Sequence, residues 1–274
     1  MNFKNLAKIT RKQAVISHLL LSAVIFISLI SLMYFKWYPG FLFDTDGGWQ
    51  GLQLISAVDF ILGPALTFII FKPEKVGLKK DIIIIALIQL SSLFGGVWIV
   101  YNERPLAIVF SDYEYRPISH GSLEFVDKPL SVLDKIPGKI PKWIYLELPE
   151  SREDRDLLRR KQFNDGPLAL MVDRWLPYEE NAHKIINFGW TIQDIIEKEL
   201  ASNKDSDIAQ KIDDWLLIQN LTREDINIFD YTGRYKESYL MVEAKTAKVL
   251  GMIPGKLGRF YAKPPKLKKE EVAK

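Results

Sequence analysis

Three long runs of apolar residues dominate the first hundred positions of the chain. They cover residues 15–35, 52–71 and 82–101, and the only acidic residue in any of them is Asp59, in the second run. A helix of about 20 residues rises about 30 Å, which matches the hydrocarbon core of a membrane. Apolar runs of this length are rare in helices buried inside soluble proteins. The pattern therefore predicts three transmembrane helices within residues 15–102.

Beyond the third run, the pattern changes to the mixture of charged and apolar residues that is typical of a soluble domain. Alternation with a period of two begins at Ile108 and continues through Tyr115, which predicts the start of a sheet. Ser151 and Thr191 each stand three residues before an aspartate, a capping pattern that predicts the start of a helix at both places. Apolar residues at helical spacing predict a further helix within residues 205–220.

Three more apolar runs near the end of the chain predict strands, and the short turn between the last two predicts an antiparallel hairpin. We therefore expect an α+β domain over residues 103–255, with its strand order left open. Residues 256–274 are rich in lysine and contain Pro264 and Pro265, which predicts a flexible basic tail. The three runs are residues 226–231, 237–244 and 248–253.

Basic residues are distributed unevenly around the apolar runs. Four lie in the N-terminal arm, residues 1–14, and four in the loop between the second and third runs, whereas the loop between the first and second runs has only Lys36. Loops rich in lysine and arginine stay on the cytoplasmic side of a membrane. This predicts a cytoplasmic N-terminal arm and places residues 103–255 outside the cytoplasm. The first run is longer than the apolar part of a signal peptide, so we expect it to be retained.

Asp59 is an acid near the middle of the second apolar run. A carboxylate there costs about 2.5–3.5 kcal/mol on insertion scales, so we expect Asp59 to face the other helices and to be partnered or protonated. Gly63 lies one helical turn further on. Pro64 removes one backbone donor and frees the carbonyl of Phe60, which Thr67 or a water can satisfy.

The depth of Asp59 in the membrane follows from counting helical rise along each run, which places the carboxylate opposite Gly95 and Gly96 in the third run. Asp59 is then either a packing residue of a small bundle or a proton or ion site that His18 would join. Packing is the simpler interpretation, because a proton relay needs several ionisable groups across the bilayer. The residues assigned to bundle packing are Asp59, Gly63, Pro64, Thr67, Gln89, Gly95 and Gly96.

The sequence contains no recognised catalytic or metal-binding pattern. It has no cysteine, which excludes disulfides, thiolate metal sites and cysteine nucleophiles. His18, His120 and His183 are too scattered for a spaced metal motif, and no HExxH, phosphate-binding loop, dinucleotide fingerprint or nucleophile elbow occurs. Acid pairs such as Glu153 and Asp154 are explained by exposed helix faces. We therefore expect no catalytic residues, no cofactor, no metal and no nucleic-acid partner.

Four fragments follow one another in a fixed order along residues 14–116. They read "FKWYPG", "GGWQGLQLISAVDFILGPALTFIIFKPEK", "LKKDIIIIALIQLSSLFGG" and "ERPLAIVFSDYEY". In this order they resemble the TfpX/TfpZ family of type IV pilin accessory proteins. The resemblance adds two motifs outside the apolar runs, an outer interface motif and a post-span motif. The outer interface motif is Trp37, Tyr38, Pro39, Gly47 and Gly48, and the post-span motif is Arg104 and Pro105.

The resemblance implies a protein of the bacterial inner membrane, with a cytoplasmic N-terminus and a periplasmic domain, that assists assembly or surface display of a cognate type IV pilin. Its partners would be that pilin, the pilus assembly machinery and the lipid bilayer. The action would be non-catalytic and chaperone-like, through contacts in both membrane and periplasm. Two alternatives remain from the residues alone. One is a membrane-anchored periplasmic sensor or ligand-binding protein, and the other is a channel or proton-coupled device centred on Asp59.

Overall fold

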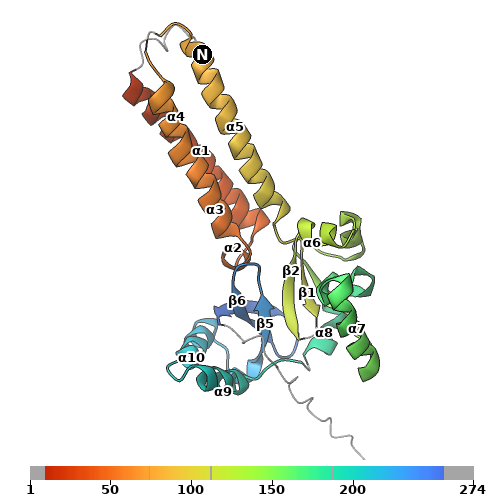
Figure 1. The fold of residues 1–274 in the computed structure, drawn as a ribbon. Coiled ribbons are helices and arrows are strands. Elements are labelled where there is room, and N and C mark those ends of the chain that lie inside the picture. The colour runs from red at the N-terminus through yellow and green to blue at the C-terminus, as the bar shows by residue number, and fades with distance from the viewer. Residues whose placement is uncertain (1–9, 74, 112, 187, 256–274) are drawn as a thin grey trace, which may run out of the picture. The chain divides into compact units, whose positions relative to one another are not determined.

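A computed structural model divides the chain into two compact units, residues 1–104 and residues 105–274. The first contains three long apolar helices and the second a sheet with helices (Figure 1). The predicted fold class, three transmembrane helices followed by an α+β domain, is confirmed. Most of the predicted N-terminal arm and the whole of the predicted basic tail lie outside the described residues. The described residues are 10–73, 75–111, 113–186 and 188–255.

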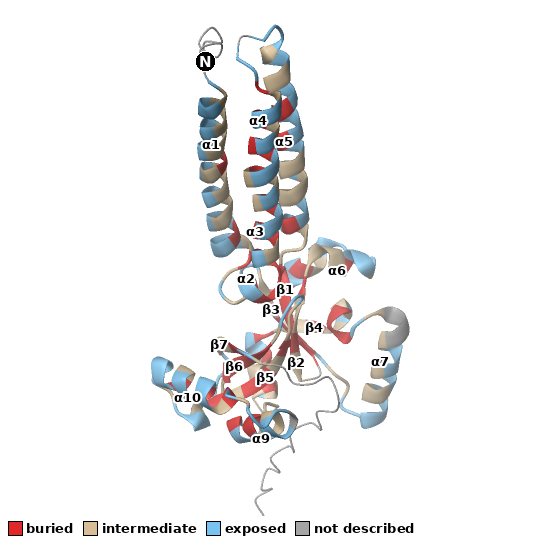
Figure 2. Ribbon diagram, turned by 60° about the vertical axis from the view of Figure 1, so that its left-hand side comes forward, coloured by how far each residue is buried: buried red, intermediate tan, exposed pale blue. Residues whose placement is uncertain are grey.

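The three membrane helices are longer than the apolar runs that predicted them. Arg11–Trp37, Gly48–Ile70 and Leu78–Asn102 are each long and apolar enough to cross a membrane. They expose large apolar side chains along most of their length, as lipid contact requires (Figure 2). The elements are α1 Arg11–Leu32, η2 Met33–Trp37, α2 Leu42–Thr45, α3 Gly48–Ser56, η3 Ala57–Leu62, α4 Gly63–Ile70 and α5 Leu78–Asn102.

Local signals explain where these helices begin and where one is distorted. The Thr10 hydroxyl accepts a hydrogen bond from the backbone N–H of Gln13, and the Gln13 side chain accepts one from the backbone N–H of Thr10. This capping box starts α1. Gly77, at φ +95°, precedes α5 in a conformation that favours glycine. The second span contains the π-helix η3 immediately before Pro64. Because proline has no N–H and crowds the preceding turn, a widened turn is a physical way to accommodate it.

The second unit is built on one mixed seven-stranded sheet with the order β4-β3-β1-β2-β5-β6-β7. Strand β1 runs parallel to β3, and β2 runs parallel to β5, while the other neighbours are antiparallel. The predicted C-terminal hairpin is confirmed as β6 and β7. The strands are β1 Ala107–Ser111, β2 Glu114–Ile118, β3 Lys142–Leu146, β4 Trp175–Pro177, β5 Ile226–Thr232, β6 Glu237–Glu243 and β7 Val249–Pro254.

Two separate groups of helices cover this sheet. Leu123, Leu158 and Leu168 pack with Val109 and Ile144 to form one core near β1 and β3. The helices α9 and α10 form a second core against β5, β6 and β7 (Figure 1). The helices are α6 His120–Phe125, η4 Leu130–Lys135, α7 Arg152–Asp165, η5 Leu168–Leu170, η6 Val172–Arg174, η7 Glu179–Asn181, α8 Ala182–Ile185, α9 Ile192–Ser202, α10 Ile208–Gln219 and η8 Arg223–Asp225.

The sequence predicted only part of this sheet. The alternation from Ile108 to Tyr115 predicted the start of a sheet, which is confirmed: this stretch contributes to two strands, β1 and β2, that pair antiparallel across a turn. Tyr113 adopts φ +75° in this turn. The strands β3 and β4 were not predicted, because one has five residues and the other three, too few to show a period. The helix starts predicted at Ser151 and Thr191 are confirmed.

Candidate functional site

Polar side chains from all three membrane helices meet in the first unit, and we call them the membrane cluster: His18, Asp59, Thr67 and Gln89, with Gly63 between them. Asp59 and Gln89 are 2% and 8% exposed. The Gln89 amide Nε2 donates to Asp59 Oδ1 at 2.7 Å and to the Val58 carbonyl at 3.2 Å. Asp59 therefore faces protein, and its direct partner is an amide on α5.

His18 joins the first helix to the second through Thr67. The Thr67 hydroxyl lies 2.8 Å from His18 Nδ1 and 3.0 Å from the Gly63 carbonyl oxygen. The sequence offered Thr67 or a water as the partner of the Phe60 carbonyl, but the Thr67 hydroxyl bonds to Gly63, one turn back on its own helix, and to His18 on α1. Ser22, one turn beyond His18, is also buried.

At Gly63 neighbouring helices approach closely. A Cβ atom there would lie 2.5 Å from His18 Nε2 and 2.7 Å from Gln89 Oε1. The two glycines expected to lie opposite Asp59 make no close contact with it. A Cβ at Gly95 would meet nothing within 4 Å, and one at Gly96 only an Ile55 carbon at 4.0 Å. Counting helical rise along each span predicted these glycines as neighbours of Asp59, because the count did not include the length of the Gln89 side chain, which reaches Asp59 from another turn of α5.

The outer interface motif holds the end of the first span against the third. Tyr38 is buried, and its hydroxyl donates to the Val100 carbonyl at 2.8 Å. Trp37 packs edge-on against Tyr101 with ring centres 5.2 Å apart. Pro39 follows the π-helix η2, where a residue without an N–H ends the helix.

The glycines of this motif shape the start of the second span. Gly47 adopts φ +115° as the residue before α3, which favours glycine. A Cβ at Gly48 would lie 2.5 Å from the Phe43 ring. In the post-span motif, the Arg104 guanidinium lies 3.6 Å from the centre of the Tyr101 ring and donates to the Tyr101 carbonyl. Pro105 is buried at the start of the second unit.

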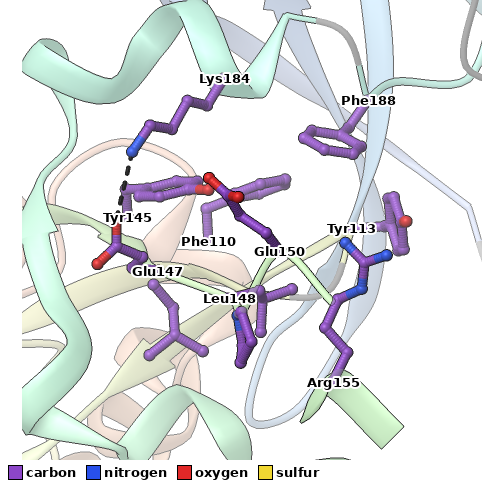
Figure 3. Close-up of a pocket in the computed structure, with 11 residues that line it drawn as sticks. Phe110, Tyr113, Tyr145, Glu147, Leu148, Glu150, Arg155, Lys184 and Phe188 are labelled. Carbon is purple, nitrogen blue, oxygen red and sulfur yellow. Dashed lines mark hydrogen bonds and ion pairs between the residues drawn. The ribbon is translucent and has the colours of Figure 1, made fainter. Parts of the chain in front are cut away.

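The second unit contains a pocket that the sequence did not indicate (Figure 3). Its volume is about 370 Å³, and it lies where the parallel strands β1 and β3 end. Phe110 and Tyr145 stack with ring centres 6.2 Å apart, and Tyr113 packs edge-on against Phe188 at 5.3 Å. The lining residues are Phe110, Tyr113, Tyr145, Leu146, Glu147, Leu148, Pro149, Glu150, Arg155, Lys184 and Phe188.

Charged side chains of both signs surround this aromatic surface. Lys184 Nζ lies 3.4 Å from Glu147 Oε1 and 5.3 Å from the centre of the Tyr145 ring. Burial raises the pKa of Tyr145, and the nearby Glu147 charge adds to the shift. Figure 3 shows Glu150 reaching into the space between Lys184 and Phe188. The arrangement suits an amphipathic ligand with an apolar part and hydrogen-bonding groups.

A second group of ionisable residues lies on the sheet beside α9. Asp230 is paired in register with Glu114 on β2 and Tyr239 on β6. Burial raises the pKa of Asp230 to about 7, Lys198 opposes the shift, and the charges of Glu114 and Glu237 add to it. Within the described parts of the chain, no three histidine, aspartate or glutamate side chains come together in a way that could hold a metal ion.

Three apolar helices followed by a helix-and-sheet domain define the class of this molecule: a membrane-anchored α+β protein. Its relatives give the family. The chain is 31% identical over 183 residues to a fimbrial assembly protein of serogroup E1 from Dichelobacter nodosus, covering 61% of this chain and 67% of that protein. A serogroup I protein of the same organism is 30% identical with the same coverage.

A third relative, the fimbrial assembly protein of Dichelobacter nodosus serogroups C1 and C2, is 37% identical over 123 residues, or 44% of this chain and 87% of that protein. The chain belongs to this family of fimbrial assembly proteins. No family model matches the chain, and no solved structure matches it.

Proposed function

We propose that this protein is an inner-membrane accessory protein that assists assembly or surface display of a cognate type IV pilin, as in the TfpX/TfpZ family. The observation that carries the proposal is the similarity to fimbrial assembly proteins over 61% of the chain. The action is non-catalytic. A protein with both a helical bundle and a folded domain can contact a membrane-embedded partner in two environments at once.

The proposed orientation places the N-terminal arm in the cytoplasm and the second unit in the periplasm. It rests on the basic residues of the arm and of the loop between the second and third spans. Alkaline phosphatase fused after residue 255 should be active and a cytoplasmic reporter at the same position inactive. The opposite result would overturn the orientation and, with it, the periplasmic contact.

Two surfaces are suited to contact the pilin. In the membrane, Phe94 on α5 is 70% exposed and stacks with the exposed Trp98 one turn further on, so the two rings form an apolar helix face that a neighbouring helix can contact. In the second unit, the aromatic pocket with its charged rim offers an apolar anchor point surrounded by hydrogen-bonding groups.

A photoreactive amino acid tests both surfaces in cells that make the chain and its pilin at native levels. Placed at Phe94 or at Glu150, it should crosslink to pilin. At Gln210, an exposed position of α10, it should capture far less. Absence of pilin from both test positions, in protein that is correctly inserted, contradicts the proposed function.

The pocket also favours one alternative, a periplasmic ligand-binding protein. A 370 Å³ cavity lined by aromatic rings is large enough for a small molecule. The double variant Arg155→Ala, Lys184→Ala separates the two functions. Loss of surface fimbriae with unchanged protein abundance supports the pilin contact, whereas normal fimbriation and lost retention of a small molecule supports the alternative.

A further inference from the structure

Two acceptor atoms of the membrane cluster are buried without a donor. Among the described residues, neither Asp59 Oδ2 nor Gln89 Oε1 has a hydrogen-bond partner. Both belong to side chains that are more than nine-tenths buried. Buried polar atoms in proteins nearly always have a hydrogen-bond partner, and the hydrocarbon of a membrane contains no water to replace a missing one. The cluster therefore lacks at least one hydrogen.

The other hydrogens of the cluster are already used. Gln89 Nε2 has two, and it donates one to Asp59 and one to the Val58 carbonyl. Thr67 has one, and its two contacts can both form only if the hydroxyl donates to the Gly63 carbonyl and accepts from His18 Nδ1–H. In a neutral imidazole this leaves Nε2 without a hydrogen. His18 Nε2 then cannot donate to Gln89 Oε1. The two atoms are neighbours, since a Cβ at Gly63 would lie within 2.7 Å of each.

The charges of these helices also indicate that the cluster lacks a proton. Asp59 lies in a span whose remaining residues carry no charge. The other charged groups of these helices lie at the helix ends. Arg11 donates to the carbonyl of Phe71, just after α4, and Asp81 on α5 pairs with Lys75. Gln89 on α5 is neutral, so His18 on α1 is the ionisable group that faces Asp59. An ionised Asp59 would need a protonated His18 to balance it, and such a buried ion pair loses more hydration energy than its attraction returns unless further hydrogen bonds support it.

We propose that the membrane cluster is a proton-binding site, in which the Asp59 carboxyl group carries one proton at neutral pH and His18 is neutral. The proton bonds to Oδ2 and converts it from an acceptor into a donor. Asp59 then accepts from Gln89 at Oδ1 and offers a hydrogen from Oδ2. All three helices meet without a net charge, and removal of the proton would leave an unpaired carboxylate that loosens the bundle. The inference concerns the bundle alone and does not depend on a pilin.

Infrared spectroscopy tests the site in the full-length protein reconstituted in lipid nanodiscs at pH 7. A protonated carboxyl group absorbs above the amide band, where carboxylates do not. We expect such a band in the wild type, its loss in Asp59→Asn, and its retention in Asp230→Asn, which removes an acid of the second unit whose pKa burial raises to about 7. Raising the pH should remove the band together with protection of the helices from hydrogen exchange.

A second measurement covers the case in which Asp59→Asn does not fold. Carbon-13 in the aspartate carboxyl groups shifts the band of a protonated aspartate, so Asp230→Asn protein with this label should show a shifted band that arises from Asp59. Absence of any protonated carboxyl band at pH 7, in protein with its full helical circular dichroism, overturns the proposal.

Discussion

At Gly63, atoms from two neighbouring helices come closer than any side chain at that position would permit. His18 Nε2 is held there by the Thr67 contact, and the Gln89 amide by its bonds to Asp59 and Val58. Neither can retreat without losing a buried hydrogen bond. The packing of α1, α4 and α5 at this point therefore depends on the absence of a side chain at Gly63.

Gly63→Ala should destabilise the membrane unit by about 1–3 kcal/mol, as overpacking of a close contact does. Gly95→Ala is the matched control, because a Cβ there meets nothing within 4 Å, and it should be neutral or slightly stabilising. Unfolding of the full-length protein in detergent, followed by helical circular dichroism, measures both. Equal stability of the two variants would contradict the close approach at Gly63.

Asp230 should make the second unit less stable as the pH rises. Its pKa is about 7 in the folded protein against an ordinary value of 3.8. Between these values the folded state holds a proton that the unfolded state releases, so the stabilisation is complete below about pH 4 and is lost as the pH rises through 7. The largest slope is about 1.4 kcal/mol per pH unit. Asp230→Asn should flatten this part of the profile in denaturant unfolding at pH 5, 6, 7 and 8, and parallel profiles for the two proteins would refute the assignment.

At the scale of elements, two buried tyrosines tie β2 to the segment after β4 and to the β6–β7 turn. The Tyr178 hydroxyl donates to the Ala247 carbonyl at 2.8 Å, so it must accept from Tyr115, whose hydroxyl lies 2.6 Å away. Burial raises the pKa of both hydroxyls, which stay protonated. The two hydroxyls therefore have different roles: Tyr178 both donates and accepts a hydrogen bond, whereas Tyr115 donates to Tyr178.

Tyr178→Phe should cost about 2–3 kcal/mol, because it strands the Tyr115 hydroxyl and the Ala247 carbonyl. Tyr115→Phe removes one bond but strands no donor, and should cost about 1 kcal/mol or less. Chemical denaturation of the full-length protein compares the variants. A larger loss for Tyr115→Phe would reverse the inferred direction of donation.

At the scale of the whole molecule, the second unit has two apolar cores of its own and a complete sheet. Residues 105–255 should therefore fold without the membrane helices and unfold cooperatively. Expressed alone, the fragment should be soluble, retain near-ultraviolet circular dichroism, and fail to restore fimbriae in cells that lack the full chain. An aggregated or molten fragment would show that the second unit depends on the first.

The sequence predicted the elements whose signals are local. Each membrane span follows from about 20 apolar residues, because hydrocarbon requires an uncharged helix of that length. The helices after Ser151 and Thr191 follow from capping residues, and the C-terminal hairpin from alternation around a short turn. Asp59 was recognised as a residue that must face protein, because exposure of a carboxylate to lipid is costly.

Tertiary structure decided which residues meet. Asp59 accepts a hydrogen bond from Gln89, a contact that counting residues by depth did not predict, because the long Gln89 side chain reaches beyond its own turn of α5. The pocket draws on β1, the end of β3, α7 and the segment around α8, which no local pattern connects. Periodicity shows which face of an element is apolar, but the partner of that face is set by the fold, because packing joins residues far apart in the chain.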